Sequence, residues 1–363
     1  MKRILLPALC LLCSCATTNK INKNIAEVNF LDDFVLPENV RTGNTEVGGL
    51  SGIDYAQGKY FIICDQPGNP RFYKAEIQLK ENKIDTVTIE EVVKIDQSAG
   101  LEDAYLDLES IRAIPEENAV FVSSEGQIEK NKDPGIYKLS EDGKFIKKFS
   151  LPGYFSASGE QKPRNNGVFE GLAKSYDGKG YWTSTELPLE KDGPKPKLFP
   201  TKSPVRITLF DSEEEKPVRQ FAYKLDGISK IPFLYFAVNG VTEILEYKKD
   251  QFLVLERAYS SGHGTNGNTV KIFSANAANA TNTLEMQQLK NKDYQLAEKK
   301  LLFNFKSVKD KLQEGIIDNI EGMTFGPTLP NGNQSLILIS DNNFNSMGKQ
   351  ITQLILLEIK FLQ

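Results

Sequence analysis

The stretch 107–126, DLESIRAIPEENAVFVSSEG, contains two short apolar runs joined by a turn, with a carboxylate near the start of the first run and another directly after the second. Short runs rich in Val, Ile and Phe, separated by Pro and Asn, are typical of a β-hairpin. Because the two strands of a hairpin are antiparallel, the start of the first lies beside the end of the second. This hairpin is therefore expected to bring Glu109 and Glu125 to one end of the pair.

The same pattern occurs four more times. The other copies read GGLSGIDY…YFIICDQ from Gly48, VFEGLAKS…GYWTSTE from Val168, VTEILEYK…FLVLERA from Val241 and NIEGMTFG…LILISDN from Asn319. We call the residue near the beginning of each first strand the start residue, and the acid that ends each second strand the end residue. The start residues are Ser51, Glu109, Glu170, Glu243 and Glu321, and the end residues are Asp65, Glu125, Glu186, Glu256 and Asp341. If the hairpins are arranged radially, these side chains form a ring of acids at one mouth of a central channel.

Strand-like segments after each hairpin indicate units of four strands, which are typical of β-propeller blades. The chain is therefore predicted to be an all-β propeller with five visible blades, and a sixth blade in the irregular stretch 226–239 stays open. The fifth repeat has only one further strand, at 352–359. The N-terminal segment 29–36 is expected to supply the missing strand, so that the two ends of the chain pair and two sheet edges are covered. Two β-sandwich domains are the competing fold, but no linker or composition break divides the chain.

The N-terminal residues have the features of a secretory leader. A basic start is followed by the apolar run 4–12, which is too short to span a bilayer. The end of this run, LCSC at 12–15, resembles a bacterial lipobox, so residues 1–14 are expected to be a lipoprotein signal peptide and Cys15 the lipidated residue. An ordinary cleaved signal is the alternative.

The leader also predicts how the rest of the chain is divided and where it works. Residues 15–27 are expected to carry the lipid and act as a tether, and 28–363 to form the propeller domain. Lipid on Cys15 would attach the protein to the membrane of the cell envelope, and Ala16 after it favours the outer membrane, by resemblance to known lipoproteins. Oligomeric state is not indicated by any feature of the sequence.

Charge and cysteine content restrict the partners and the chemistry. The chain has 44 basic and 48 acidic residues and no basic stripe interleaved with aromatics, so nucleic acid is not an expected partner. Once the leader is removed and Cys15 is lipidated, only Cys64 remains, which excludes an intramolecular disulfide.

A ring of acids needs compensation, because carboxylates within ~5–8 Å of one another repel unless they bind a cation, share protons or pair with Arg or Lys. Calcium is the expected cation, since it accepts six to eight oxygen ligands in loose geometry. Zinc is not expected, because His263 is the single histidine and no cysteine cluster is present. The alternative interpretation is that the acids cap blade turns. His263 lies in the glycine-rich loop 260–267. The backbone amides of this loop either bind an anion, or the loop simply connects two strands of a blade.

As a set, the motifs resemble the phytase-like family, whose domain is described as having esterase-like activity. The residues that carry the resemblance are GGLSGIDY at 48–55, DLESI at 107–111, SSEG at 123–126, FEGLA at 169–173, STE at 184–186, LERAYSSGHG at 255–264, NIEGM at 319–323 and ISDNNF at 339–344. The resemblance covers about residues 45–360. The chain differs from the histidine acid phytases, because the residue before His263 is glycine and the signature R-H-G-x-R-x-P is absent.

The resemblance implies an envelope-anchored, metal-dependent hydrolase of small phosphoesters or esters, and calcium-dependent propeller phytases offer the chemical analogy. By that analogy the nine acids would hold cations, Glu170, Glu321, Arg257 and His263 would act in catalysis, and Arg112 or Arg257 would pair with a phosphate oxygen. Both arginines also lie close in sequence to predicted ring acids, so a salt-bridge role is equally open. A non-catalytic binding propeller with structural calcium is the alternative function, and a carboxylester or lactone hydrolase is the third.

Overall fold

The computed structural model describes residues 24–345 and 349–362. Almost all of the regular structure is antiparallel sheet, and the helical pieces are six short 3-10 turns. These turns are η1 (Pro115–Glu117), η2 (Ile128–Lys130), η3 (Gly153–Phe155), η4 (Gly264–Asn266), η5 (Phe305–Lys311) and η6 (Asn343–Asn345). No helix of the described residues is long and apolar enough to cross a membrane.

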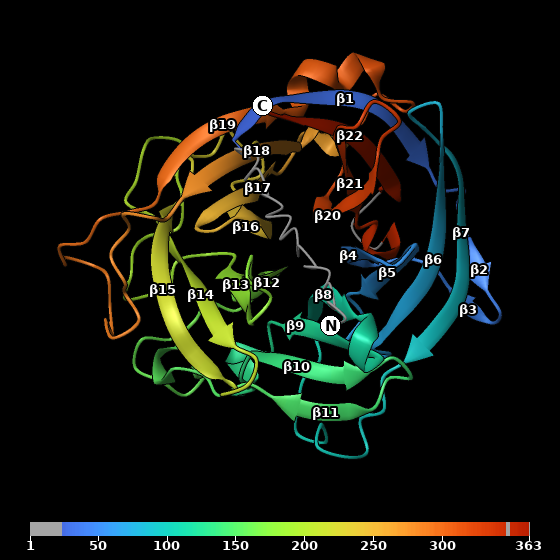
Figure 1. The fold of residues 1–363 in the computed structure, drawn as a ribbon. Coiled ribbons are helices and arrows are strands. Elements are labelled where there is room, and N and C mark those ends of the chain that lie inside the picture. Colours follow the sequence, from blue (N-terminus) through green and yellow to red (C-terminus); the bar gives the residue numbers. More distant parts are fainter. Residues whose placement is uncertain (1–23, 346–348, 363) are drawn as a thin grey trace, which may run out of the picture.

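Five four-stranded sheets are arranged around a centre, as Figure 1 shows, and confirm the prediction of a five-bladed propeller. The first four sheets follow the sequence. Sheet one has β4 (Leu50–Ala56), β5 (Lys59–Cys64), β6 (Arg71–Lys80) and β7 (Lys83–Lys94), and sheet two has β8 (Leu108–Ile114), β9 (Ala119–Ser124), β10 (Gly135–Ser140) and β11 (Phe145–Lys148). Sheet three has β12 (Phe169–Lys174), β13 (Gly180–Thr185), β14 (Pro204–Asp211) and β15 (Lys216–Lys224), and sheet four has β16 (Ala237–Lys248), β17 (Gln251–Ser260), β18 (Asn268–Asn276) and β19 (Glu298–Asn304).

The fifth sheet combines both ends of the chain. It has β20 (Ile320–Thr328), β21 (Gln334–Ser340) and β22 (Gln353–Phe361), and its outer strand is β1 (Ile25–Val35). β1 runs antiparallel to β22, with Val28 opposite Ile359 and Val35 opposite Gln353. The strand begins at Ile25, inside the segment that the sequence assigned to the tether. The leader and Cys15 lie outside the described residues.

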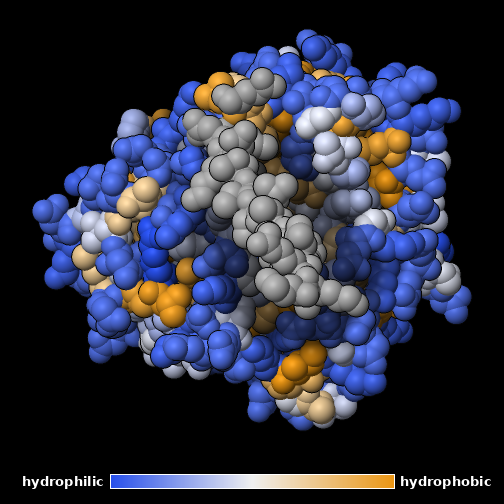
Figure 2. Space-filling view, in the orientation of Figure 1, coloured by the Kyte–Doolittle hydropathy of each residue, from blue (hydrophilic) through white to orange (hydrophobic). Residues whose placement is uncertain are grey.

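The remaining strands are a small hairpin, β2 (Arg41–Thr42) with β3 (Thr45–Glu46), that belongs to no blade. The stretch 226–236 contains no strand, so the described residues hold no sixth blade. Figure 2 shows a largely hydrophilic face on which apolar residues gather only in separate small patches.

Apolar side chains fill the spaces between neighbouring sheets. There are five clusters of buried apolar residues, and each joins two adjacent sheets; one contains Ile63 of β5 and Val122 of β9, and another contains Ile62 of β5 and Ile339 of β21. Because both faces of each sheet are covered, the central strands read as nearly continuous apolar runs, such as LILI at 336–339. Five interfaces for five sheets mean that every sheet packs against two neighbours.

The innermost strands β4, β8, β12, β16 and β20 surround the channel and contact one another. They approach so closely that three of them require glycine at equivalent positions. A Cβ atom at Gly52 would lie 2.6 Å from the carbonyl oxygen of Glu109, one at Gly171 2.9 Å from the amide nitrogen of Ile244, and one at Gly322 2.9 Å from the Cα atom of Gly52. The glycine after Ser51, Glu170 and Glu321 is thus explained by strand packing.

A buried ion pair between Arg112 and Glu243 lies between the innermost strands, and we call these two residues the channel plug. The guanidinium Nη2 of Arg112 lies 2.9 Å from Oε2 of Glu243. Nη1 donates to the carbonyl oxygens of Ile53 (2.9 Å) and Ile111 (2.6 Å), and Nη2 approaches those of Ile244 (3.5 Å) and Met323 (3.4 Å).

Glu243 completes the plug from the opposite side of the channel. Its Oε1 accepts hydrogen bonds from the backbone N–H of Leu172 (2.9 Å) and Ile244 (3.0 Å), and its Oε2 accepts one from the hydroxyl of Ser110 (2.8 Å). Together the two side chains bind backbone groups of all five innermost strands. This number of partners is what a buried charge pair requires to offset the cost of leaving water.

Candidate functional site

A β-bulge lies at the same place in each innermost strand, close to the mouth of the channel. In β4, for example, Leu50 pairs with Cys64 and Gly52 with Ile63, which leaves Ser51 as the extra residue. Bulges of this kind redirect a side chain out of the regular alternation. The residues at this position are Ser51, Glu109, Glu170, Thr242 and Glu321.

The end positions are also equivalent from sheet to sheet. The backbone N–H of Asp65 donates to Gly49 O (2.7 Å), and the N–H groups of Glu125, Glu186 and Asp341 make the matching bonds in sheets two, three and five. In sheet four the pairing of Val241 with Glu256 and of Gly240 with Arg257 places Arg257, not Glu256, at the end position. The side chains therefore meet as expected in four sheets, and the fourth is shifted by one residue.

Glu243 and Glu256 do not join the other acids, which corrects the predicted ring at two of its nine acidic positions. Glu243 follows the bulge residue Thr242 and belongs to the channel plug. Glu256 is buried elsewhere, where its carboxylate accepts hydrogen bonds from the hydroxyl of Tyr223 (2.7 Å) and the amide of Asn239 (2.9 Å) and pairs with Lys299. Arg112 is likewise in the plug and is not at the mouth.

The remaining acids gather at the mouth with one acid that the ring pattern missed. Asp107, just before β8, completes a group of three with Asp65 and Glu109, in which one carboxylate oxygen of each lies within 4.8 Å of the others. Glu109, Glu125 and Glu170 form a second group by the same distance. We use the name acid cluster for Asp65, Asp107, Glu109, Glu125, Glu170, Glu186, Glu321 and Asp341.

Arg257 is the cation that contacts the acid cluster. Its Nη2 lies 3.1 Å from Oε1 of Glu321 and 3.5 Å from Oε1 of Glu186. Nε of Arg257 has no hydrogen-bond partner among the described residues, and neither has the hydroxyl of Thr242, which is buried at the bulge position of sheet four. The site thus combines eight carboxylates, one guanidinium and an unpartnered buried hydroxyl.

The sequence also matches a known family over most of its length. The family model described as phytase-like, "Esterase-like activity of phytase", matches residues 45–344.

The chain belongs to the phytase-like family.

This confirms the resemblance drawn from the motifs. No curated protein matches the chain. Among solved structures, similar ones include a xylan β-1,4-xylosidase from Bacillus halodurans C-125, with a TM-score of 0.45 and 10% identity over 88% of this chain. The phytase-like chain spans 54% of the length of that protein.

Two other solved structures have comparable similarity. A GH43 β-xylosidase/α-arabinofuranosidase from a compost microbial metagenome, described in complex with xylotriose in a calcium-free form, has a TM-score of 0.41 and 11% identity, covering 87% of this chain and 94% of its own. A luciferin-regenerating enzyme has a TM-score of 0.38 and 12% identity, with 86% and 78% covered. Scores and identities at this level carry no argument about activity.

Burial gives the phytase-like acid cluster unusual proton affinity. Loss of hydration, followed by repulsion from neighbouring carboxylates, raises the pKa of Glu109, Glu125 and Glu170 well above the usual value of 4.5. Burial raises the pKa of Glu186 to about 7, although Arg257 opposes this shift, and burial and Glu321 raise the pKa of Asp341 to about 8. Without a bound cation, several of these groups are protonated at neutral pH.

We expect the phytase-like domain, when stripped of metal, to lose stability as the pH rises. A group whose pKa is higher in the folded than in the unfolded state contributes stability that is complete below the unfolded pKa, 4.5 for Glu186 and 3.8 for Asp341. That stability is lost as the pH passes the folded pKa, about 7 and about 8. In excess chelator the melting temperature should therefore fall by several degrees between pH 5 and pH 8, and a flat profile would contradict it.

His263 does not contact the acid cluster. Its Nε2 lies 2.8 Å from the carbonyl oxygen of Ile231, and its ring packs 4.5 Å from that of Phe233, in an exposed position. The loop that carries it thus packs against segment 231–236, where five of the six side chains are large, apolar and exposed. The structure places His263 in this surface contact and not at the cluster to which the sequence assigned it.

Proposed function

We propose that this phytase-like propeller is a calcium-dependent hydrolase of small phosphoesters or esters that acts at the acid cluster. The observation that carries the proposal is the pair of carboxylate triads that share Glu109, each with ligand oxygens within 4.8 Å of one another. Like charges at this separation require a cation or protons. All of the donors are oxygen atoms, which fits calcium and not zinc.

The unpartnered hydroxyl of Thr242 supports the fit of a ligand at the mouth. A buried hydroxyl without a hydrogen bond is costly, so its presence at the bulge position favours an additional group that binds there. Asp65, Asp107, Glu109, Glu125 and Glu170 would hold the cations. Calcium, when bound, would supply positive charge for a substrate oxygen and lower the pKa of water.

The other residues of the mouth have roles that follow from their contacts. Arg257 is fixed by Glu186 and Glu321, and its Nε is buried without a hydrogen-bond partner, so it would donate to an anionic oxygen that enters the acid cluster. Burial raises the pKa of Glu321, although Arg257 and the amide of Asn319, 3.0 Å away, oppose this shift; Glu321 would orient the arginine through their ion pair. Glu170 has no side-chain hydrogen-bond partner among the described residues and a raised pKa, which suits proton transfer during hydrolysis.

The alternative is a non-catalytic binding propeller in which calcium is structural. The burial of the carboxylates favours this function, because six of the eight are almost inaccessible to solvent. A cation held there would join residues of sheets one, two and three. In that case the cation would stabilise the fold, and hydrolysis of phosphoesters and carboxyl esters would be absent.

A calcium titration tests both proposals. We expect saturable binding to the chelator-treated protein by calorimetry, together with a rise in melting temperature of several degrees, because the cation replaces protons in the acid cluster. Magnesium at the same concentration is the matched control, since it requires stricter octahedral geometry. Absence of binding would remove the metal from both functions, whereas binding without hydrolysis of either ester class would leave the structural one.

We further propose that the protein is attached to the cell envelope through lipid on Cys15, with the outer membrane as the expected location. The lipobox-like LCSC at 12–15 supports this proposal. Labelling with radioactive palmitate should mark the full chain but not the Cys15→Ser variant. Equal labelling of the two would contradict it.

A further inference from the structure

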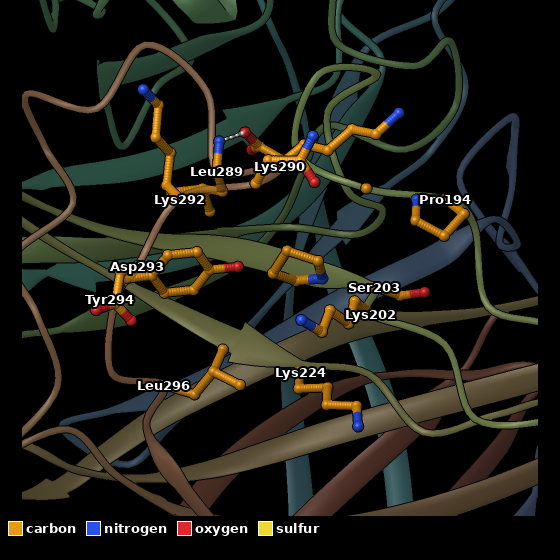
Figure 3. A pocket seen from close by; sticks show the side chains of 14 residues that line it. Pro194, Lys202, Ser203, Lys224, Leu289, Lys290, Lys292, Asp293, Tyr294 and Leu296 are labelled. Atoms are coloured by element: carbon orange, nitrogen blue, oxygen red, sulfur yellow. Dashed lines mark hydrogen bonds between the residues drawn. The ribbon is translucent and has the colours of Figure 1, made fainter.

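A second site lies away from the acid cluster, between two long loops at the outer side of sheets three and four. Loop 186–203 connects β13 to β14, and loop 277–297 connects β18 to β19. They enclose a cavity of about 420 Å³ (Figure 3). A volume of this size accommodates a small ligand such as a monosaccharide derivative.

The cavity walls are held in place by a buried ion pair. The guanidinium of Arg206 on β14 binds Asp192 of the first loop through Nε (2.6 Å) and Nη2 (2.8 Å). Arg206 also donates to the carbonyl oxygen of Met286 in the second loop (2.9 Å), and Asp192 accepts from the backbone N–H of Leu289 (2.8 Å). Both side chains are fully buried, so the two loops are joined before any ligand arrives. A preformed cavity loses little entropy on binding.

The rim of the cavity is strongly basic. Its four lysines are Lys202, Lys224, Lys290 and Lys292. None of their ammonium groups has an ion pair or a hydrogen bond among the described residues. Asp192 is neutralised by Arg206, so Asp293 is the one unpaired carboxylate in the lining. The rim therefore has an excess of positive charge in a chain whose net charge is −4.

The interior of the cavity is less polar than the rim. Leu289, Leu296, Pro204 and the ring of Tyr294 contribute apolar surface. In Figure 3, Lys290 and Lys292 lie on one side of the cavity and Lys224 on the opposite side, and the aromatic ring of Tyr294 lies between them. An aromatic ring provides a flat face for the C–H face of a sugar, while lysines bind anionic oxygens. The arrangement matches a ligand that joins a ring to a negative charge.

We propose that this cavity is a binding site for an anionic sugar, such as a sugar phosphate, and that it is separate from the acid cluster. The anion would lie among the rim lysines and the sugar ring against Tyr294. The proposal does not depend on hydrolysis at the mouth or on calcium. It assigns a ligand to a part of the molecule that the proposed function leaves unused.

Calorimetric titration of glucose 6-phosphate into the full chain in excess chelator tests the site. We expect saturable binding that weakens at least tenfold in the Lys290→Ala/Lys292→Ala double variant and also weakens as salt is added. The matched control is Lys80→Ala/Lys83→Ala, which removes two exposed, unpaired lysines of sheet one. No saturable binding, or an equal loss in the control, would overturn the proposal.

Two more measurements separate the parts of the site. Tyr294→Ala should weaken glucose 6-phosphate at least threefold but leave inorganic phosphate unchanged, because only the sugar ring needs the aromatic face. Glu170→Gln should bind glucose 6-phosphate as the unmodified chain does, since that residue belongs to the acid cluster. Loss of binding in Glu170→Gln would move the ligand to the mouth and refute a separate site.

Discussion

Replacing Arg112 with alanine is expected to lower the free energy of unfolding by about 3–5 kcal/mol. The substitution leaves Glu243 buried, with no side-chain surface exposed beyond 1%, and without the cation that neutralises it. It also removes hydrogen bonds to carbonyl groups of the innermost strands of four sheets. Denaturant unfolding followed by tryptophan fluorescence measures the loss, since Trp182 is buried in the core between sheets three and four.

Two controls identify the cause of that loss. Lys59→Ala breaks an exposed ion pair with Glu90 and should leave the free energy of unfolding nearly unchanged. The double variant Arg112→Met/Glu243→Leu removes both charges and should be more stable than Arg112→Ala, because no buried charge is left alone. If the double variant is no more stable than Arg112→Ala, the loss of stability comes from the hydrogen bonds to the carbonyl groups and not from the unpaired charge of Glu243.

Replacing Glu170 with glutamine is expected to reduce kcat for ester hydrolysis by about 100-fold or more while the protein stays folded. The substitution keeps the shape of the side chain but removes its charge and its capacity to transfer a proton. Removing one of several repelling carboxylates should also raise the melting temperature of the metal-free protein at pH 8. Steady-state kinetics and thermal melts on the same preparation measure both effects.

Glu321→Gln should also reduce turnover strongly, and unlike Glu170→Gln it should weaken substrate binding. Because Glu321 holds Arg257 at 3.1 Å, this change should raise KM for an anionic substrate as well as lower kcat. The control is Glu314→Gln, which changes an exposed glutamate in a turn outside the acid cluster and should behave as the unmodified protein does. Turnover at the normal rate in both Glu170→Gln and Glu321→Gln would remove the acid cluster from the mechanism.

The sequence predicted the fold well because each blade is coded locally. Apolar runs, turn residues and the repeat of one hairpin pattern identified five blades and most of their strands. The strand predicted at 352–359, for instance, is observed as β22 (Gln353–Phe361). These features are set by residues close to one another along the chain, so they can be recognised in a single sequence.

The candidate site was predicted in outline but misplaced in sheet four. In sheets two, three and five the apolar residue before the bulge is followed by Glu and then by a small residue, as in Phe169-Glu170-Gly171. In sheet four the same order reads Val241-Thr242-Glu243, so counting from the apolar residue would have selected Thr242. The end position of sheet four is set by the pairing of Gly240 with Arg257, which the spacing along the chain does not give. The prediction selected the carboxylates of each hairpin by residue type. Position relative to the bulge, however, decides which side chains reach the mouth.

The sequence left a salt-bridge role open for Arg112, but it predicted neither the channel plug nor the sugar-sized cavity. Arg112 reaches carbonyl groups of residues as far apart as Ile53 and Met323, so its role exists only when five strands converge. The cavity is formed by two irregular loops that are joined through Arg206, a residue of a third segment. Such contacts depend on tertiary structure that periodicity does not encode.

The channel plug also determines how molecules would travel to and from the mouth. Because Arg112 and Glu243 bind backbone groups of all five innermost strands, a site proposed at the acid cluster would be a well with one opening and not a passage. In the proposed hydrolase, substrate would enter and product would leave through that one opening. A long polymer could present only its terminus to a well of this kind.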